Sequence, residues 1–215
     1  MNQLWQTARF SKLDEMVGNT AALAALRAID SGFVLIEGPI GCGKTSTALA
    51  WVNERFGTKL EEQQAIWQMG RYCLEHVHAN DFQLEDATKQ KQFFYTATPT
   101  VIIVDEAQDL MMKRQQSKLK TIPARANFTL VLVTSMPEML EASIRDRCSR
   151  IRLGPLSARE LKAMVERACT LRGIPFDVTL LQALNRAQVF RPRAILNVVD
   201  SVARGVPVEQ AVVGQ

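Results

Sequence analysis

Eight consecutive residues near the N-terminus have the composition of a phosphate-binding loop. They read Gly38-Pro39-Ile40-Gly41-Cys42-Gly43-Lys44-Thr45 and match the pattern G-x-x-x-x-G-K-[ST]. Glycines let backbone N–H groups turn inward around phosphate oxygens, and the positive end of a following helix adds to that attraction. The pattern therefore predicts a site for ATP with Mg²⁺.

The residues of this loop receive separate roles. Lys44 is predicted to reach the β- and γ-phosphates, and Thr45 to place its hydroxyl on Mg²⁺. Cys42 stands at a variable position of the motif and is given no chemistry of its own. The residues predicted to surround the nucleotide here are Gly38, Gly41, Cys42, Gly43, Lys44, Thr45 and Ser46.

Two adjacent acids follow the apolar residues 101–104. Asp105, at the end of a predicted strand, is expected to hold Mg²⁺, usually through water, and is the second metal-site residue beside Thr45. Glu106 then faces the γ-phosphate and orients or deprotonates the attacking water. Gln108 and Asp109 are interpreted as residues of a helix N-terminus and not as catalytic groups.

Two hydroxyl residues end the next apolar run. Ser135, or its neighbour Thr134, is predicted to hydrogen-bond the attacking water or the γ-phosphate. Hydroxyl residues are also common in the turns that follow strands, so this assignment depends on the two motifs before it.

The elements that must position these residues follow from the hydrophobic pattern. Apolar runs without alternation are typical of strands buried on both faces of a parallel sheet. Strands are predicted at 33–37, 82–86, 100–106 and 129–135, with a last strand that contains Arg150 and Arg152. Helices are predicted at 19–32, with Gly32 as its C-terminal cap, at 43–56 and within 107–122.

The pattern changes to helix alone after residue 157. Ser157 and Glu160 form the capping-box pattern S-x-x-E before a helical segment, and helices near 177–187 and 191–204 follow. The chain is therefore predicted to contain an α/β domain, residues 1–153, and a small helical domain, residues 154–215.

Composition restricts the compartment and the partner. The chain has no apolar run long enough to cross a membrane, its N-terminus lacks the sections of a signal peptide, and its four cysteines are widely spaced. We therefore expect a cytoplasmic protein with reduced thiols and no membrane partner. Residues 1–110 carry 9 Lys and Arg against 14 Asp and Glu, whereas residues 111–215 carry 17 against 8. The basic second half favours a polyanion partner, although it could instead neutralise the acidic half.

Taken together, the motifs resemble those of the AAA+ ATPases, and more narrowly the clamp-loader subfamily of replication factor C small subunits and bacterial DnaX-type subunits. The resemblance covers nearly the whole chain. It is carried by "LWQTARFSKLDEMVGN" (4–19), "GPIGCGKTSTALA" (38–50), "FQLEDAT" (82–88), "LKTI" (119–122), "IRDRCSR" (144–150) and "RPRAILNVVD" (191–200).

This resemblance implies a P-loop domain with a parallel five-stranded sheet and a helical lid that closes over the nucleotide. It implies that Val17 and Gly18 contribute to the adenine pocket and that Arg193 reaches the γ-phosphate of its own chain. It implies that Arg147 reaches the nucleotide of a neighbouring subunit, where a planar, permanently charged guanidinium suits the transition state. Arg150 and Arg152 are interpreted as solvent-facing or close to the nucleotide.

The resemblance also implies that ATP is hydrolysed in an oligomer assembled around DNA during replication. The partners are then duplex or primer-template DNA, other AAA+ subunits and a sliding clamp. Lys113, Arg114, Lys118 and Lys120 are predicted to contact the DNA backbone without sequence preference. A solvated basic helix explains the same residues.

Three departures from the subfamily keep other functions open. The segment 87–100 is shorter than the corresponding segment of the subfamily, and the acidic or proline pair after 119–121 is missing. We also expect the protein to lack the collar that follows the lid in clamp loaders. The alternatives are an AAA+ regulator of DNA recombination or transposition, and a structural adaptor that does not hydrolyse ATP. Cys73, His76 and His78 supply at most three zinc ligands, so 72–78 is interpreted as a surface helix or turn.

Overall fold

The computed structural model describes residues 4, 10–68, 70–82, 98–110, 116–120, 122 and 126–214, without the side chains of residues 117 and 118. Four earlier predictions therefore lie wholly or largely outside the described part. They concern the strand at 82–86, the DNA contacts of Lys113 and Arg114, and the side chain of Lys118.

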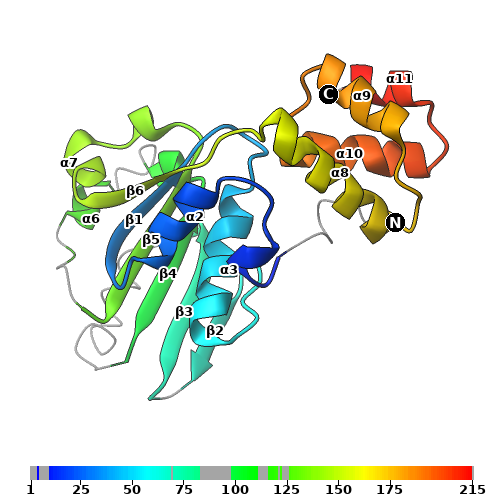
Figure 1. The fold of residues 1–215 in the computed structure, drawn as a ribbon. Coiled ribbons are helices and arrows are strands. Elements are labelled where there is room, and N and C mark those ends of the chain that lie inside the picture. The colour runs from blue at the N-terminus through cyan, green and yellow to red at the C-terminus, as the bar shows by residue number, and fades with distance from the viewer. Residues whose placement is uncertain are drawn as a thin grey trace.

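A six-stranded sheet with the order β2-β3-β4-β5-β1-β6 forms the centre of the larger part of the molecule (Figure 1). Five strands run parallel, as predicted, and β2 adds an antiparallel edge beside β3 that the sequence did not predict. The strands are β1 (Gly32–Glu37), β2 (Ala65–Gln68), β3 (Tyr72–His78), β4 (Thr100–Asp105), β5 (Phe128–Thr134) and β6 (Cys148–Arg152).

Alternation along the central strands sends side chains into two separate cores. On β1, Val34 and Ile36 face one layer of helices, whereas Phe33 and Leu35 face the other. The first layer contains η1 (Leu13–Glu15), α2 (Thr20–Arg27) and α3 (Lys44–Phe56). The second contains η2 (Ala107–Leu110), α6 (Gln116–Leu119), η3 (Pro137–Met139) and α7 (Ala142–Arg145). Burial on both faces explains why these strands lack polar alternation.

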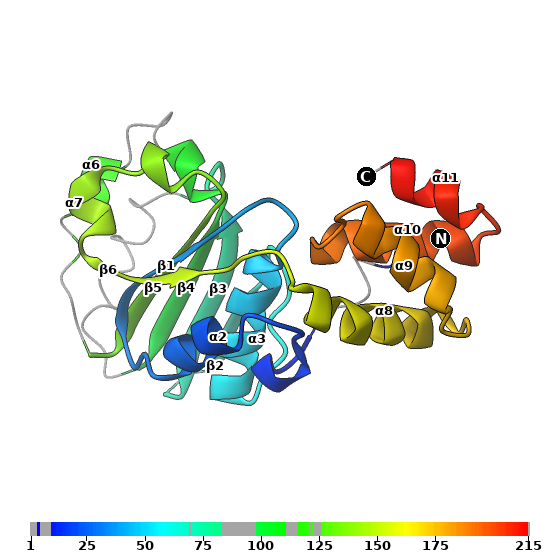
Figure 2. The same ribbon diagram turned by 45° about the horizontal axis from the view of Figure 1, so that its top comes forward.

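The last four helices pack together on a core of their own, to one side of the sheet (Figure 2). They are α8 (Ala158–Arg172), α9 (Val178–Arg186), α10 (Pro192–Ala203) and α11 (Val208–Val213). The capping box at the start of α8 is present: the Ser157 hydroxyl accepts a hydrogen bond from the Glu160 N–H, and the Glu160 carboxylate accepts one from the Ser157 N–H. Within the described ranges, no helix has the length and apolar character needed to cross a bilayer.

Two sequence-based element predictions were wrong. Residues 72–78 are the strand β3, not a surface helix or turn, because Tyr72, Cys73 and Leu74 are buried and the strand pairs with β4. The helix predicted to span 19–32 ends at Arg27, and Gly32 begins β1 with φ of 102° instead of capping that helix. Both errors concern segments whose conformation depends on the neighbouring strands and not on local pattern.

Candidate nucleotide-binding site

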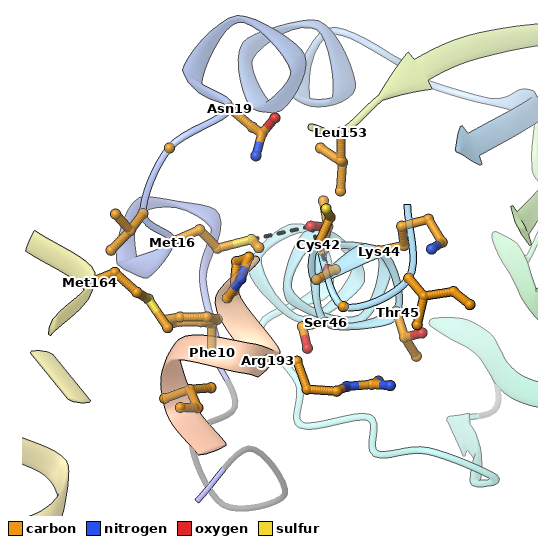
Figure 3. Close-up of a pocket in the computed structure, with 18 of the residues that line it drawn as sticks. Phe10, Met16, Asn19, Cys42, Lys44, Thr45, Ser46, Leu153, Met164 and Arg193 are labelled. Atoms are coloured by element: carbon orange, nitrogen blue, oxygen red, sulfur yellow. Dashed lines mark hydrogen bonds between the residues drawn. The ribbon is translucent and has the colours of Figure 1, made fainter. Parts of the chain in front are cut away.

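A cleft that is partly open to solvent lies between the carboxyl edge of the sheet and the C-terminal helices. Figure 3 shows most of the residues that line it. Lys44 and Thr45 lie at one end of the cleft, whereas Phe10, Met16 and Met164 gather at the other. The lining is therefore polar at one end and apolar at the other, which suits a nucleotide.

The phosphate-binding loop connects β1 to α3 and begins under tight steric restriction. Gly38 has φ of 149°, and a Cβ at this position would lie 2.1 Å from the backbone oxygen of Leu153. Only glycine fits such an approach. The Leu153 N–H donates to the oxygen of Glu37 over 2.8 Å, so the chain after β6 holds the start of the loop in place.

Glu37, directly before the loop, is a buried carboxylate held by two arginines of β6. Its side chain is 3% exposed. Arg150 donates to both carboxylate oxygens over 2.8 and 3.0 Å, and Arg152 donates to one of them over 2.9 Å. The expectation that these arginines face solvent is confirmed, since their side chains are 44% and 75% exposed and neither lines the cleft. Their shared contact with Glu37 was not predicted, and it arises because β6 pairs with β1 in a register that sets Arg150 opposite Leu35 and Arg152 opposite Glu37.

Lys44 and Thr45 lie at the first turn of α3, beside the end of β4. The Lys44 Nζ donates to the backbone oxygens of Gly38 and Pro39 over 2.9 and 3.0 Å. Burial lowers the pKa of Lys44, while the carboxylates of Glu106 and Asp105 act in the opposite direction. The ammonium group is thus placed inside the loop, where phosphates would bind.

Thr45 and Asp105 bring two oxygen ligands together. The Thr45 hydroxyl donates to the Asp105 carboxylate over 2.8 Å. Burial alone would raise the pKa of Asp105, but the His76 ring, the Thr45 hydroxyl and the Glu106 N–H hold it below its ordinary value. A hydroxyl beside an ionised carboxylate is a donor set that fits Mg²⁺.

Glu106 has an unusual backbone conformation. Its φ is 51°, in the left-handed region that non-glycine residues seldom adopt. Its carboxylate accepts a hydrogen bond from the Gln108 amide over 2.6 Å. Both Asp105 and Glu106 line the cleft, so the structure brings the two acids to the loop as the motifs predict.

The apolar end of the cleft is built by residues from three parts of the chain. Val17 and Gly18 are among the residues that line the cleft, together with Phe10, Met164 and Leu196. The Arg167 guanidinium lies over the Phe10 ring at 4.4 Å from its centroid. An aromatic ring and methionines are suitable neighbours for a flat base.

Arg193 and Ser135 lie differently relative to the cleft. Arg193 lines the cleft from the start of α10 (Figure 3). Its backbone N–H donates to the backbone oxygen of Gly41 over 3.1 Å. Ser135 follows β5 and is not one of the lining residues, whereas Thr134 before it is buried and donates from its hydroxyl to Gln108.

Arg147 lies at the opposite edge of the sheet from its own phosphate-binding loop. It precedes Cys148, which pairs with Phe33 at the beginning of β1, whereas the loop follows the end of β1. Its guanidinium donates to the backbone oxygens of Leu119, Lys120 and Ile122 over 3.4, 2.9 and 2.8 Å. It also lies 4.4 Å from the centroid of the Phe33 ring.

The other predicted surface and metal residues are placed as follows. Lys120 is exposed at the end of α6 and forms an ion pair with Glu141. Cys73 and His76 point to opposite faces of β3: the Cys73 sulfur accepts from the Trp67 indole, and His76 lies 3.7 Å from Asp105. No group of three or more His, Cys, Asp or Glu suited to a metal was found among the residues with described positions.

Several residues of the site escaped sequence reasoning. Glu37 carried a weak signal, since it is an acid at the end of an apolar run. Phe10 and Met164 carried none, because only the folded chain brings residues 10 and 164 to one pocket. Gln108 was interpreted as a helix N-terminal residue, but its side chain bonds Glu106 and Thr134.

Comparison with known proteins finds similar chains among replication factor C subunits. Replication factor C subunit 2 of Arabidopsis thaliana is 25% identical over 85% of this chain and 56% of its own length. The replication factor C small subunit of Aeropyrum pernix is 22% identical over 94% of this chain and 63% of its own length. The chain thus resembles replication factor C subunits, as the motifs indicated, and spans less than two thirds of their length.

Solved structures share the fold at low identity. A RuvB mutant of Thermotoga maritima superposes with a TM-score of 0.65 at 20% identity, covering 96% of this chain and 72% of the RuvB chain. The FIGL-1 AAA domain in complex with ADP gives 0.64 at 16% identity, over 92% and 74%. The model of the ATPase family associated with various cellular activities matches residues 34–156, which is more than half of the chain, and the protein therefore belongs to the AAA family of ATPases.

Proposed function

We propose that this chain is an ATPase subunit of clamp-loader type that acts on DNA during replication. One observation carries the proposal: Lys44, the Thr45–Asp105 pair and Glu106 meet at one end of a cleft whose other end is apolar. The cleft lies between the proposed α/β domain, residues 1–153, and the proposed helical domain, residues 154–215. The resemblance to replication factor C subunits supports the DNA-related part.

In this proposal each residue has a chemical task. The loop N–H groups and Lys44 hold the phosphates, and Thr45 and Asp105 hold Mg²⁺, which supplies positive charge to the β- and γ-phosphate oxygens when bound. Glu106 takes a proton from water as the water oxygen bonds to the γ-phosphorus and the bond to the β–γ bridging oxygen breaks, giving ADP and phosphate. Phe10, Val17, Gly18 and Met164 surround the base.

Two arginines complete the charge balance at the γ-phosphate. Arg193, on α10, acts within its own chain from the far side of the cleft. Arg147 lies at the opposite edge of the sheet, about 13 Å along β1 for the four residue steps from Phe33 to Glu37. A side chain at that edge is poorly placed for its own nucleotide and suited to a neighbour's, which supports a role between subunits.

Contacts with DNA are proposed for the segment that contains Lys118 and Lys120. Such contacts to phosphates are independent of sequence and weaken as salt increases. Further AAA+ subunits and a sliding clamp are the proposed protein partners.

Measurement of ATP turnover and of particle mass tests this function. With ATP, Mg²⁺ and primer-template DNA, the wild-type chain alone or with partner subunits should hydrolyse ATP and form a larger particle. Glu106→Gln should lower turnover by at least about 100-fold without weakening ATP binding. Turnover that Glu106→Gln leaves unchanged, or a mass and rate that DNA never alters, would contradict the proposal.

A further inference from the structure

Gln108 links the proposed catalytic base to the end of the neighbouring strand. β4 ends at Asp105, and the short helix η2, Ala107–Leu110, turns Gln108 back toward the end of β5. Its amide donates to Oε2 of Glu106 over 2.6 Å, and its carbonyl oxygen accepts from the Thr134 hydroxyl over 2.5 Å. Gln108 therefore connects two groups on adjacent strands.

The chemistry of the two neighbours determines which way the Gln108 amide points. An ionised carboxylate has only acceptors, so the NH₂ group must face Glu106. The Thr134 hydroxyl accepts a hydrogen bond from the Met136 N–H over 3.0 Å, which leaves its own proton for the Gln108 oxygen. The reversed amide would set two acceptors against each other at Glu106, so only this orientation satisfies both neighbours.

Thr134 is a firm anchor for this chain of hydrogen bonds. It is fully buried, with 0% exposure, and it is the last residue of the central strand β5. Glu106, by contrast, is partly exposed at the cleft and has φ of 51°. A residue in that conformation needs support from its surroundings to keep one position.

We propose that Gln108 is a positioning residue that orients Glu106 for proton transfer, with Thr134 fixing the Gln108 amide. The bond to Oε2 leaves Oε1 of Glu106 to take the proton from water. This arrangement matches the general requirement that a catalytic base is itself oriented by a third group. The inference rests on the proposed ATPase function, because it assigns a support to the base of that reaction.

Steady-state kinetics of ATP hydrolysis test this inference. A general base contributes about 10²- to 10⁴-fold to the rate, and a misplaced base should lose part of that. Gln108→Ala should therefore lower kcat by about 10- to 100-fold and change KM for ATP by less than about twofold. Thr134→Val should lower kcat in the same way, whereas Thr134→Ser keeps the hydroxyl and should retain most of the activity. The exposed Gln182→Ala on α9 serves as the matched control and should change nothing.

A double-variant comparison separates positioning from general damage. In the Glu106→Gln background, Gln108→Ala should cause little further loss, because its effect acts through Glu106. An equal further loss there, a rise in kcat, or a change confined to KM would overturn the inference. If Glu106→Gln abolishes ATPase activity but Gln108→Ala leaves it at the wild-type level, the inference is overturned while the proposed function stands. A wild-type chain whose ATPase does not depend on Glu106 would overturn the proposed function and the inference with it.

Discussion

Replacing Glu37 with glutamine should destabilise the protein measurably, although Glu37 does not line the cleft. The carboxylate is 3% exposed and accepts three hydrogen bonds from Arg150 and Arg152. A hydrogen bond to a charged group contributes about 1.5–3 kcal/mol. Two effects reduce the total loss: the amide still accepts one bond, and the two guanidinium groups, 44% and 75% exposed, can be hydrated.

We therefore expect Glu37→Gln to lower the free energy of unfolding by about 2 kcal/mol, or the Tm by about 4–8 °C for a chain of this size. Thermal and urea unfolding measure this. Glu138→Gln, the same change at an exposed position, should stay within about 0.5 kcal/mol of wild type.

The sign of the effect should reverse when the arginines are removed. In an Arg150→Ala/Arg152→Ala background, the buried carboxylate has lost both partners, and an unpaired buried charge is costly. Glu37→Gln should then stabilise the chain. The reasoning is refuted if Glu37→Gln is as stable as wild type in the normal background, or if it remains destabilising without the arginines.

Three further predictions concern a cap, a thiol and the base pocket. Ser157→Ala removes the capping box of α8 and should cost about 1 kcal/mol in urea unfolding; no change would contradict it. Burial raises the pKa of Cys148 to about 12 from its ordinary 9.0. As pH rises from 9, the unfolded chain therefore loses the Cys148 proton before the folded chain does, and the free energy of unfolding should decrease toward pH 12. At pH 8 the native Cys148 thiol should resist iodoacetamide, which peptide mass mapping can check. Phe10→Ala should weaken ATP binding about 10-fold in calorimetry with little effect on inorganic triphosphate, whereas equal losses for both would place Phe10 away from the base.

Much of the fold follows from local sequence patterns. The phosphate-binding loop, the strands on either side of Asp105 and the capping box at Ser157 depend on neighbouring residues, and the structure contains all of them. The strand β3 could not be predicted in this way. It carries Glu75, His76 and His78 within seven residues, and its pairing with β4 and β2 makes it a strand.

The details of the site depend on contacts between distant segments. The pairs Glu37–Arg150 and Glu37–Arg152 join residues 113 and 115 positions apart, and they form only because β6 lies beside β1. The bond between Gln108 and Thr134 needs β4 and β5 to be neighbours. Residue types and motif spacing identify the phosphate and metal residues, but they do not reveal the residues that hold these groups in place.

Arg147 gives the most direct test of the account, because it is proposed to complete the site of a neighbouring chain. Arg147→Ala and Lys44→Ala chains should each be nearly inactive, and their mixture should recover ATPase activity, since one chain keeps an intact loop and the other an intact arginine. Arg147 also bonds three backbone oxygens of its own chain, so thermal unfolding must first show that both variants are folded. Recovery in the mixture is the predicted result; two folded variants that form mixed particles without any recovery would contradict the account.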